Sequence, residues 1–358
     1  MKSFGLWYKE SKSIESEELK ARFDLHVNFW SESVEIDGRK KVPYLDIGIK
    51  VTNYEYVDKL VFQCPFRVEQ EEFEDLSNVI ADQKTADIIF NDNCNVSTKM
   101  SVAIIATEKE KLIVVSKEFA QDLFKLVNKG SRTNIEIDMS TFVNVLKNKG
   151  IELSDTVAYA RFRIKTQAMK DSIYFDSEPI NKSFDSAFSG TRIIDFKINS
   201  KRNLDEQIYS EVKPEEFPQI NKIHLLIMEP ASYNVESFSK EGMTCRELEN
   251  DLWSNYLGGK NNIIRGHILA YHWKKDSENN GSFKEYSCLV KVQYSRAKLS
   301  TIAAYVTIAV AIGMFGSFLV ALIQMATGNS LNCDFTIVNI IISVTLMIIG
   351  WLIGKYIK

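Results

Sequence analysis

Hydrophobic and polar residues alternate along much of the first 200 residues. Within 23–29, apolar side chains occupy every second position, and Asp24, His26 and Asn28 lie between them, which is the period of a half-buried β-strand. The segment 45–51 has the same period. Similar segments predict strands at 60–68, 88–90, 102–106, 112–115, 134–137, 157–165 and 192–198. So many short strands predict a β-sandwich-like domain, or an open barrel, over residues 1–200.

Three short helices are predicted to interrupt these strands. The segment 71–83 carries apolar residues at helical spacing. The segments 117–128 and 141–149 each follow a serine, a natural N-cap, and each is followed within two residues by a glycine, a natural C-terminal stop. The N-terminal domain is therefore expected to be mostly β with short helices.

Residues 201–298 predict a second, smaller domain. The polar segment 199–219 contains two prolines and is the best candidate for a boundary. After it come an apolar strand, a capping box at Thr244–Glu247 before a short helix, and two long strands. The strands are expected at 222–228, 263–273 and 286–294, and the helix at 248–256. This β-α-β-β order is typical of a small α+β unit, and the chain as a whole is predicted to be α+β and mostly β.

Residues 299–358 predict a transmembrane hairpin. The segments 301–325 and 335–354 contain no charged residue. As helices they would be roughly 37 Å and 30 Å long, enough to cross a hydrocarbon core of about 30 Å. Only Ser295–Ser300 separate the last predicted strand from the first span, so a movement of that strand could be passed to the span. The alternative is a domain that simply rests on the membrane surface.

The distribution of charge sets an orientation for the two spans. Two basic residues precede the first span and two follow the second, whereas the connector between them has no Lys or Arg. The positive-inside rule therefore predicts that both termini are cytoplasmic. The formal net charge of −3 divides into +3 for residues 296–358 and −6 for residues 1–295, and an acidic body is a poor general binder of nucleic acid.

Searches for catalytic chemistry find no motif. The chain lacks the signatures of serine hydrolases, zinc peptidases, P-loop NTPases, dinucleotide-binding enzymes and protein kinases. Its five cysteines include no CxxC pair, which disfavours a structural zinc site and fits a reducing compartment. Of the histidines, His267 and His272 would face opposite sides of a strand, His26 is interpreted as solvated and His224 as a core residue. The sequence therefore predicts no catalytic residue, no metal and no cofactor.

A row of basic residues is the first candidate for a binding site. Arg161, Arg163 and Lys165 share one face of a predicted strand, and Arg192 adds positive charge near the domain boundary. Such a row could hold an anionic ligand, for example the phosphate of a nucleotide. The alternative is a solvated sheet face whose charges are balanced by acidic neighbours.

Glu229 is a second candidate because it follows directly on a buried strand. Ligands of α/β proteins bind near strand ends, and Tyr271, Trp273 and His267 share a face of the next long strand, where they could supply stacking. The alternative is a solvent-facing strand end beside an aromatic core.

Each predicted span has a face rich in small or polar residues. The first carries Ala309, Gly313, Ser317 and Ala321, and the second carries Asn339, Ser343, Gly350 and Gly354. Small residues let helices approach closely in lipid, where packing and hydrogen bonds replace the hydrophobic drive. The two faces predict either that the hairpin packs on itself or that the chain forms homo-oligomers, as a cluster or a pore.

A cytosolic β-rich region joined to a two-span hairpin resembles, in architecture, the two-transmembrane effectors of bacterial anti-phage defence. In the best-known of those proteins the spans precede the sensing domain, whereas here they follow it. The resemblance implies a sensor in the bacterial inner membrane that self-associates on binding a nucleotide-like ligand or a protein partner and perturbs the lipid. One alternative function is a non-enzymatic scaffold that tethers a soluble partner, and another is an anchored enzyme of unfamiliar type.

Overall fold

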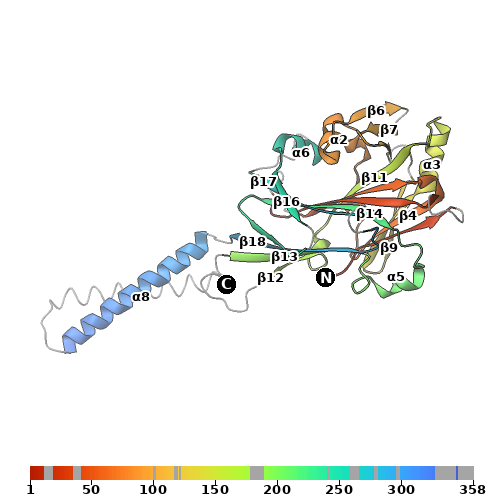
Figure 1. Ribbon diagram of the computed structural model, residues 1–358. Helices are drawn as coiled ribbons and strands as arrows, with labels where there is room; N and C mark the ends of the chain where they lie inside the picture. The colour runs from red at the N-terminus through yellow and green to blue at the C-terminus, as the bar shows by residue number, and fades with distance from the viewer. Residues whose placement is uncertain are drawn as a thin grey trace. The chain divides into compact units, whose positions relative to one another are not determined.

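The computed structural model contains three β-sheets, short helices and one long apolar helix (Figure 1). It describes residues 1–11, 19–34, 42–99, 102–116, 120, 122–177, 189–239, 242–258, 266–277, 281–295, 299–326 and 344–345. The chain forms two compact units. The first comprises Met1–Ser177 and Arg192–Gln293, and the second comprises Glu178–Thr191 and Tyr294–Lys358.

The largest sheet runs through most of the first unit. Its strand order is β16 (Met243–Glu247), β17 (Ile268–Asp276), β14 (Ile220–Pro230), β2 (Arg22–Trp30), β3 (Tyr44–Thr52), β11 (Thr156–Lys165), β8 (Lys111–Val115), β7 (Val102–Ala106) and β6 (Asn95–Lys99), with β5 (Phe73–Asp75) also paired to β11. Neighbouring strands are antiparallel except for two parallel pairs, β14 with β2 and β11 with β8. We call this the main sheet.

Two four-stranded sheets complete the β structure. One has the order β1 (Gly5–Glu10), β4 (Val57–Cys64), β10 (Arg132–Asp138) and β9 (Phe124–Lys129), and the other has the order β12 (Tyr174–Ser177), β13 (Ser189–Ile198), β18 (Tyr286–Ser295) and β15 (Asn234–Ser237). Apolar residues from all three sheets form one core, as Leu25, Phe62 and Val290 illustrate. The prediction of a mostly β protein is confirmed, and the β structure consists of several sheets.

Short helices cover part of the other face of the main sheet. They are α1 (Ser77–Ile80), α2 (Gln83–Phe90) and α6 (Asn250–Tyr256), and Figure 1 shows α2 and α6 on the side of the sheet away from β12, β13 and β18. Trp253 and Tyr256 of α6 pack with Trp30 and Met228 of the sheet. Helices α3 (Met139–Asn148) and α5 (Glu206–Glu211) lie beside the smaller sheets.

Several predicted elements differ from the observed ones. The segment 88–90 is the end of helix α2, because Asp82 caps the helix through the Thr85 amide and the apolar residues that follow pack on the main sheet. The segment 71–83 contains strand β5 and helix α1 instead of one helix. Residues 124–129, predicted as helix, form strand β9, and Gly130, with φ of +62°, makes the turn to β10 instead of ending a helix.

Helix α3 confirms the third predicted helix, but its N-cap is Asp138, whose carboxylate accepts from the Thr141 amide at 2.8 Å. Thr244–Glu247 is not a capping box, because these residues form edge strand β16 and pair with β17. Helix α6 begins three residues later, at Asn250.

The segments assigned to separate domains share sheets. Strand β14 pairs in parallel with β2 along eight residue pairs, and β13 neighbours β18. Residues on both sides of position 200 belong to one compact unit, so the predicted boundary near residue 200 does not divide the sheets. Parallel pairing between segments about 200 residues apart leaves no local signal in the sequence.

Within the described residues of the C-terminal part, one helix is long and apolar enough to cross a membrane. Helix α8 (Leu299–Ala326) includes the candidate span Tyr305–Ile323, with a mean hydropathy of 2.5. The second predicted span, 335–354, lies outside the described residues except for 344–345, as do Asn339, Ser343, Gly350 and Gly354.

Candidate functional site

Arg161, Arg163, Lys165 and three of the histidines lie on the face of the main sheet that does not contribute to the shared core, which we call the polar face. Strand alternation places Asp24, His26, Asn28 and Trp30 of β2 on this face. It has two parts. The closed half, made by Trp30, Asp46, Arg161, Arg163 and Tyr256, is covered by helix α6. The open half, made by His26, Lys50, Lys222, His224 and His272, is half-buried.

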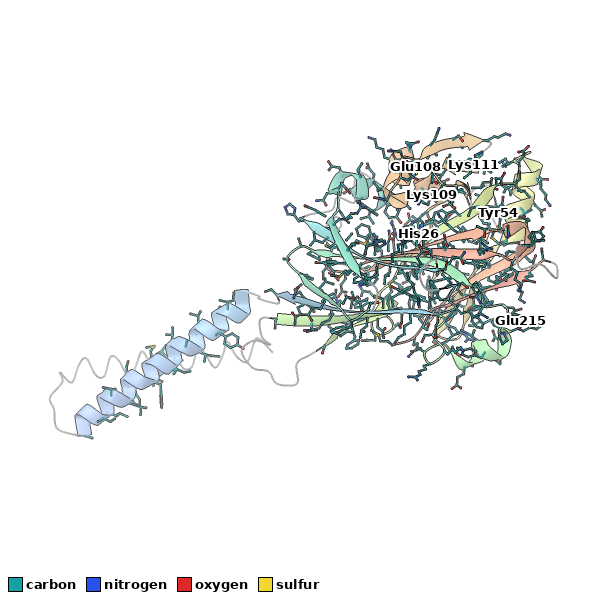
Figure 2. The ribbon with its side chains drawn as sticks, viewed as in Figure 1. His26, Tyr54, Glu108, Lys109, Lys111 and Glu215 are labelled. Carbon is teal, nitrogen blue, oxygen red and sulfur yellow. The ribbon has the colours of Figure 1, made fainter. Side chains whose placement is uncertain are left out.

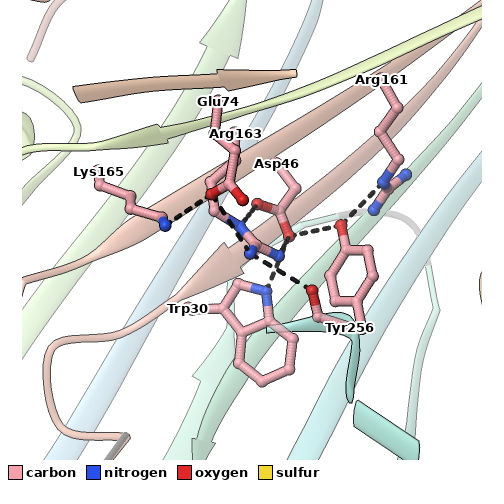
Figure 3. Close-up of polar contacts among 7 residues, drawn as sticks. All are labelled: Trp30, Asp46, Glu74, Arg161, Arg163, Lys165 and Tyr256. Carbon is pink, nitrogen blue, oxygen red and sulfur yellow. Dashed lines mark hydrogen bonds and ion pairs between the residues drawn. The ribbon is translucent and has the colours of Figure 1, made fainter. Parts of the chain in front are cut away.

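Asp46 is the centre of the closed half. The Arg163 guanidinium donates to both of its oxygens, at 2.6 and 3.1 Å, and both side chains are 0% exposed. Trp30 Nε1 and the Tyr256 hydroxyl donate to Oδ2 at 3.1 and 2.7 Å (Figure 3). Burial by itself raises the pKa of Asp46, but the charge and hydrogen bonds of Arg163 outweigh burial and hold the pKa below its usual value. Asp46 is therefore a charged, fully satisfied carboxylate.

Arg161 is buried beside this pair with aromatic hydroxyls as partners. Its Nε donates to Tyr256 Oη and its Nη1 to Tyr159 Oη, both at 2.9 Å. With its amide oxygen turned toward the guanidinium, Asn28 accepts from Nη2 at 2.9 Å. Among the described residues no carboxylate lies within ion-pair distance of Arg161. The closed half therefore contains two buried cations and one buried anion.

Gly48 makes room for the Arg161 side chain. A Cβ at this position would overlap the Tyr159 hydroxyl and would lie 2.9 Å from Arg161 Nη1. The glycine lies directly opposite Arg161 in the β3–β11 pair, so the guanidinium and the phenol cross the sheet over its backbone. A side chain here would displace one of them.

The predicted basic row does not form an exposed surface for a ligand. Arg161, Arg163 and Lys165 do share one face of β11, but the first two are 1% and 0% exposed, and Lys165 pairs with Glu74 at 2.6 Å. Arg192 lies on β13 of another sheet, where it pairs with Glu32 and Asp176 at 2.6 and 3.0 Å. The structure therefore does not bring Arg192 into the row, and all four cations have partners within the chain.

Glu229 faces the interior instead of solvent. Its side chain is 0% exposed, and neither carboxylate oxygen has a hydrogen-bond partner of good geometry among the described residues. Burial raises the pKa of Glu229 to about 8, in spite of the nearby positive charge of Arg192. The carboxyl is therefore mostly protonated at neutral pH. The sequence correctly placed Glu229 at the end of a buried strand, but it did not show that the side chain faces the interior.

The open half brings together three of the four histidines. His26 on β2 lies opposite His224 on β14, and His272 on β17 lies opposite Leu226, on the same face (Figure 2 labels His26). His224 Nδ1 and His272 Nε2 are 3.0 Å apart, and the two ring planes are nearly parallel, with an interplanar angle of 7° and centroids 5.2 Å apart. The His26 ring is perpendicular to that of His224, with centroids 5.3 Å apart. His26 Nδ1 is 3.3 Å from Tyr159 Oη, which connects the open half to Arg161.

Basic residues surround these rings. Lys222 and Lys274 both pair with Asp276, at 3.3 and 3.0 Å, and Lys50 pairs with Glu110. Burial is the largest cause that lowers the pKa values of all three histidines, that of His224 to about 3. Neighbouring basic residues lower all three pKa values further, and neighbouring histidines lower those of His26 and His224. The rings are therefore neutral at neutral pH.

The sequence analysis missed this cluster. It interpreted His26 as solvated and His224 as a core residue, and it considered His272 only with His267, which instead pairs with Glu247 at the surface. The sequence does show one histidine in each of two predicted strands, 23–29 and 222–228. It does not show that these two strands pair in parallel, which is what brings His26 and His224 together. In the part of the chain that the structure describes, no group of three or more His, Cys, Asp or Glu has the arrangement of a metal site.

Comparisons with known proteins give no family for this chain. No protein family model matches it, and no curated protein matches it. The solved structure of an M1 zinc metallopeptidase from Deinococcus radiodurans matches with 10% sequence identity and a TM-score of 0.24, over 80% of this chain and 42% of that chain. A two-domain M1 zinc metallopeptidase mutant bound to L-arginine matches with 9% identity and a TM-score of 0.25, over the same shares. The chain covers less than half of these proteins, and TM-scores this low carry no argument about its fold or function.

Proposed function

We propose that the protein is a membrane-anchored sensor or effector. In this proposal the β-rich body lies in the cytoplasm of a bacterium, as do both termini, and receives a ligand or a protein partner. The C-terminal spans then self-associate in the inner membrane and perturb it, in a role similar to that of the two-transmembrane anti-phage effectors. The observation that carries the proposal is helix α8, an apolar helix that follows strand β18 after only residues 296–298.

The surface of α8 supports self-association. Ala309, Gly313, Ser317 and Ala321 recur every fourth residue and share one helix face. No described atom outside the helix backbone lies within 4 Å of a Cβ built on Gly313, so a second helix could approach closely there. The Ser317 hydroxyl donates to the Gly313 carbonyl at 3.2 Å, which satisfies it inside the helix and lowers its cost in lipid.

The second candidate function is a scaffold that holds a soluble partner at the membrane. It is favoured by the ion pairs of Arg163, Lys165 and Arg192 inside the protein, because these cations are then part of the architecture and are not held ready for a ligand. Arg161 is likewise buried, with hydroxyl and amide partners. A scaffold needs the membrane helices only as an anchor, so it predicts no dependence on the small-residue face of α8.

The test compares two variants of the full chain expressed in bacteria. Gly313→Leu fills the small-residue face, whereas Phe315→Leu changes the opposite face, about 200° around the helix. Membrane pellets are washed with carbonate, oligomers are trapped by chemical cross-linking, and membrane integrity is followed by entry of a DNA-binding dye. We expect the parent and Phe315→Leu to give cross-linked oligomers and dye entry, and Gly313→Leu to lose both.

Two results would overturn the proposal. If the parent protein leaves the membrane in the carbonate wash, α8 does not anchor it. If Gly313→Leu and Phe315→Leu match the parent in cross-linking and dye entry, self-association through this face is wrong and the scaffold remains.

A further inference from the structure

We infer that the open half of the polar face binds a small doubly charged oxyanion of the phosphate class and takes up a proton on the His224–His272 pair as it binds. The inference rests on the proposed function, since it names the class of ligand that the sensor would receive. It uses His26, His224 and His272, which the sequence analysis did not assign to any site.

The first argument is the supply of exposed hydrogen-bonding groups. The His224–His272 contact uses one nitrogen of each ring, and the Tyr159 contact uses Nδ1 of His26. The opposite nitrogens are His26 Nε2, His224 Nε2 and His272 Nδ1, and the described residues give none of them a hydrogen-bond partner. All three side chains are half-buried, so these nitrogens have access to solvent while the rings are held in place. A pre-positioned set of this kind is typical of a binding site for a small polar ligand.

The second argument is the sign of the charge. The charged groups that act most strongly on the three rings are all basic, and they come from five strands: Lys50, Arg161, Lys222, Arg246 and Lys274. The carboxylates beside them are Asp24, Glu110, Asp276 and Glu249, the last 3.9 Å from Arg246. Because Lys222 and Lys274 share Asp276, and Arg161 has only hydroxyl and amide partners, the pairing leaves positive charge without a matching carboxylate. This surplus favours an anion and disfavours a metal cation.

The His224–His272 contact can hold a proton. The two nitrogens, His224 Nδ1 and His272 Nε2, are 3.0 Å apart and the ring planes are nearly parallel, so the rings can share one proton. Without a ligand, burial first and the surrounding cations second keep both rings neutral by lowering their pKa values. An adjacent dianion supplies the opposite charge and raises the pKa of the pair, so one proton moves from solvent to an imidazole and no covalent bond changes. Binding is therefore expected to tighten as the pH falls.

The experiment is isothermal titration calorimetry of the full chain in detergent, at constant ionic strength, in two buffers with different enthalpies of ionisation. Sulfate is the main probe because it stays doubly charged at both pH 6 and pH 8, so any pH dependence belongs to the protein. We expect binding about tenfold tighter at pH 6 than at pH 8, with uptake of up to about one proton. Inorganic phosphate and adenosine monophosphate are then compared, to distinguish a free anion from a phosphate ester.

Histidine variants provide the controls. We expect His224→Gln and His272→Gln to abolish proton uptake, and His267→Gln, outside the cluster on the same chain segment, to leave it unchanged. Thermal unfolding at pH 8 shows which variants are folded. Equal sulfate affinity at the two pH values, unchanged binding by folded His224→Gln, or no saturable heat from the folded parent would each overturn the inference. Sulfate binding in detergent does not depend on self-association through α8. The calorimetry and the α8 variants therefore test this inference and the proposed function separately.

Discussion

The two halves of the polar face use the same strands in opposite ways. In the closed half, Arg163 and Asp46 are fully buried and every charge is engaged by a guanidinium, a phenol or an indole. In the open half, His26, His224 and His272 are half-buried, neutral and in contact with one another. Helix α6 places Tyr256 over the arginines, whereas the open half has a ring contact between His26 and Phe90 of α2, with centroids 6.1 Å apart. A buried charge is stable only when groups inside the protein replace its contacts with water. In a half-exposed site, polar atoms can instead contact water or a ligand.

The largest effect is expected from removing the central anion of the closed half. Asp46→Asn removes the buried carboxylate beside Arg161 and Arg163 and leaves only the more exposed Glu74, 3.9 Å from Arg163, so we expect a loss of about 3–5 kcal/mol in the free energy of unfolding. Chemical denaturation of the full chain in detergent, followed by the circular dichroism of the β-sheets, measures it. Asp24→Asn is the matched control in the open half and should change stability by less than about 1 kcal/mol. Similar losses for both would remove the distinction between the halves.

Glu229 is a buried carboxyl for which the described residues supply no hydrogen-bond partner of good geometry. Its raised pKa means that the folded state binds a proton more tightly than the unfolded state, so stability is greatest below the ordinary glutamate pKa of about 4.5 and falls as the pH rises toward 8. Glu229→Gln removes this cost, and we expect the variant to be more stable than the parent by about 4 kcal/mol at pH 8.5 and by less than about 0.5 kcal/mol at pH 4.5. Denaturation curves at the two pH values test this. A variant less stable than the parent at pH 8.5 would show that the carboxylate is paired.

The junction between the halves depends on Gly48. Gly48→Ala pushes against Tyr159 and Arg161, and we expect a loss of about 1–3 kcal/mol. Gly242→Ala, at a position where an added Cβ meets no described atom within 4 Å, is the control and should be close to neutral. If the two variants have the same melting temperature, the Arg161 side chain can move away from the sheet at little cost.

The smallest expected effect is the acid sensitivity of the open half. The histidine pKa values are lowered in the folded state, so stability falls as the pH drops below the unfolded value of about 6.5. For His224, with a folded pKa of about 3, the loss at pH 5.5 is about 1 kcal/mol. His224→Gln should therefore lose less stability than the parent between pH 7.5 and pH 5.5, and His267→Gln should lose as much as the parent. Parallel curves for parent and His224→Gln would contradict a neutral, desolvated ring.

Alternation of polar and apolar residues was enough to predict most strands of the main sheet, and it correctly placed Arg161, Arg163 and Lys165 on one face. The alternation could not predict that helix α6 covers part of that face. Tyr256 reaches Asp46 across 210 residues of sequence, and the β14–β2 pairing that joins His224 to His26 spans 198. Local patterns also failed where tertiary contacts outweighed them, as at Phe124–Lys129, which pairs with β10 in spite of its helix-like ends.

The most direct test of the account is a pH titration of ¹³C-labelled histidine rings in the full chain by nuclear magnetic resonance, with signals assigned from single His→Gln variants. We expect the pKa values of His26, His224 and His272 to lie below the ordinary value of about 6.5 in the free protein. Sulfate should raise the pKa of the His224–His272 pair. Titration of these rings near 6.5, with no response to sulfate, would contradict both the neutral cluster and its assignment as the anion site.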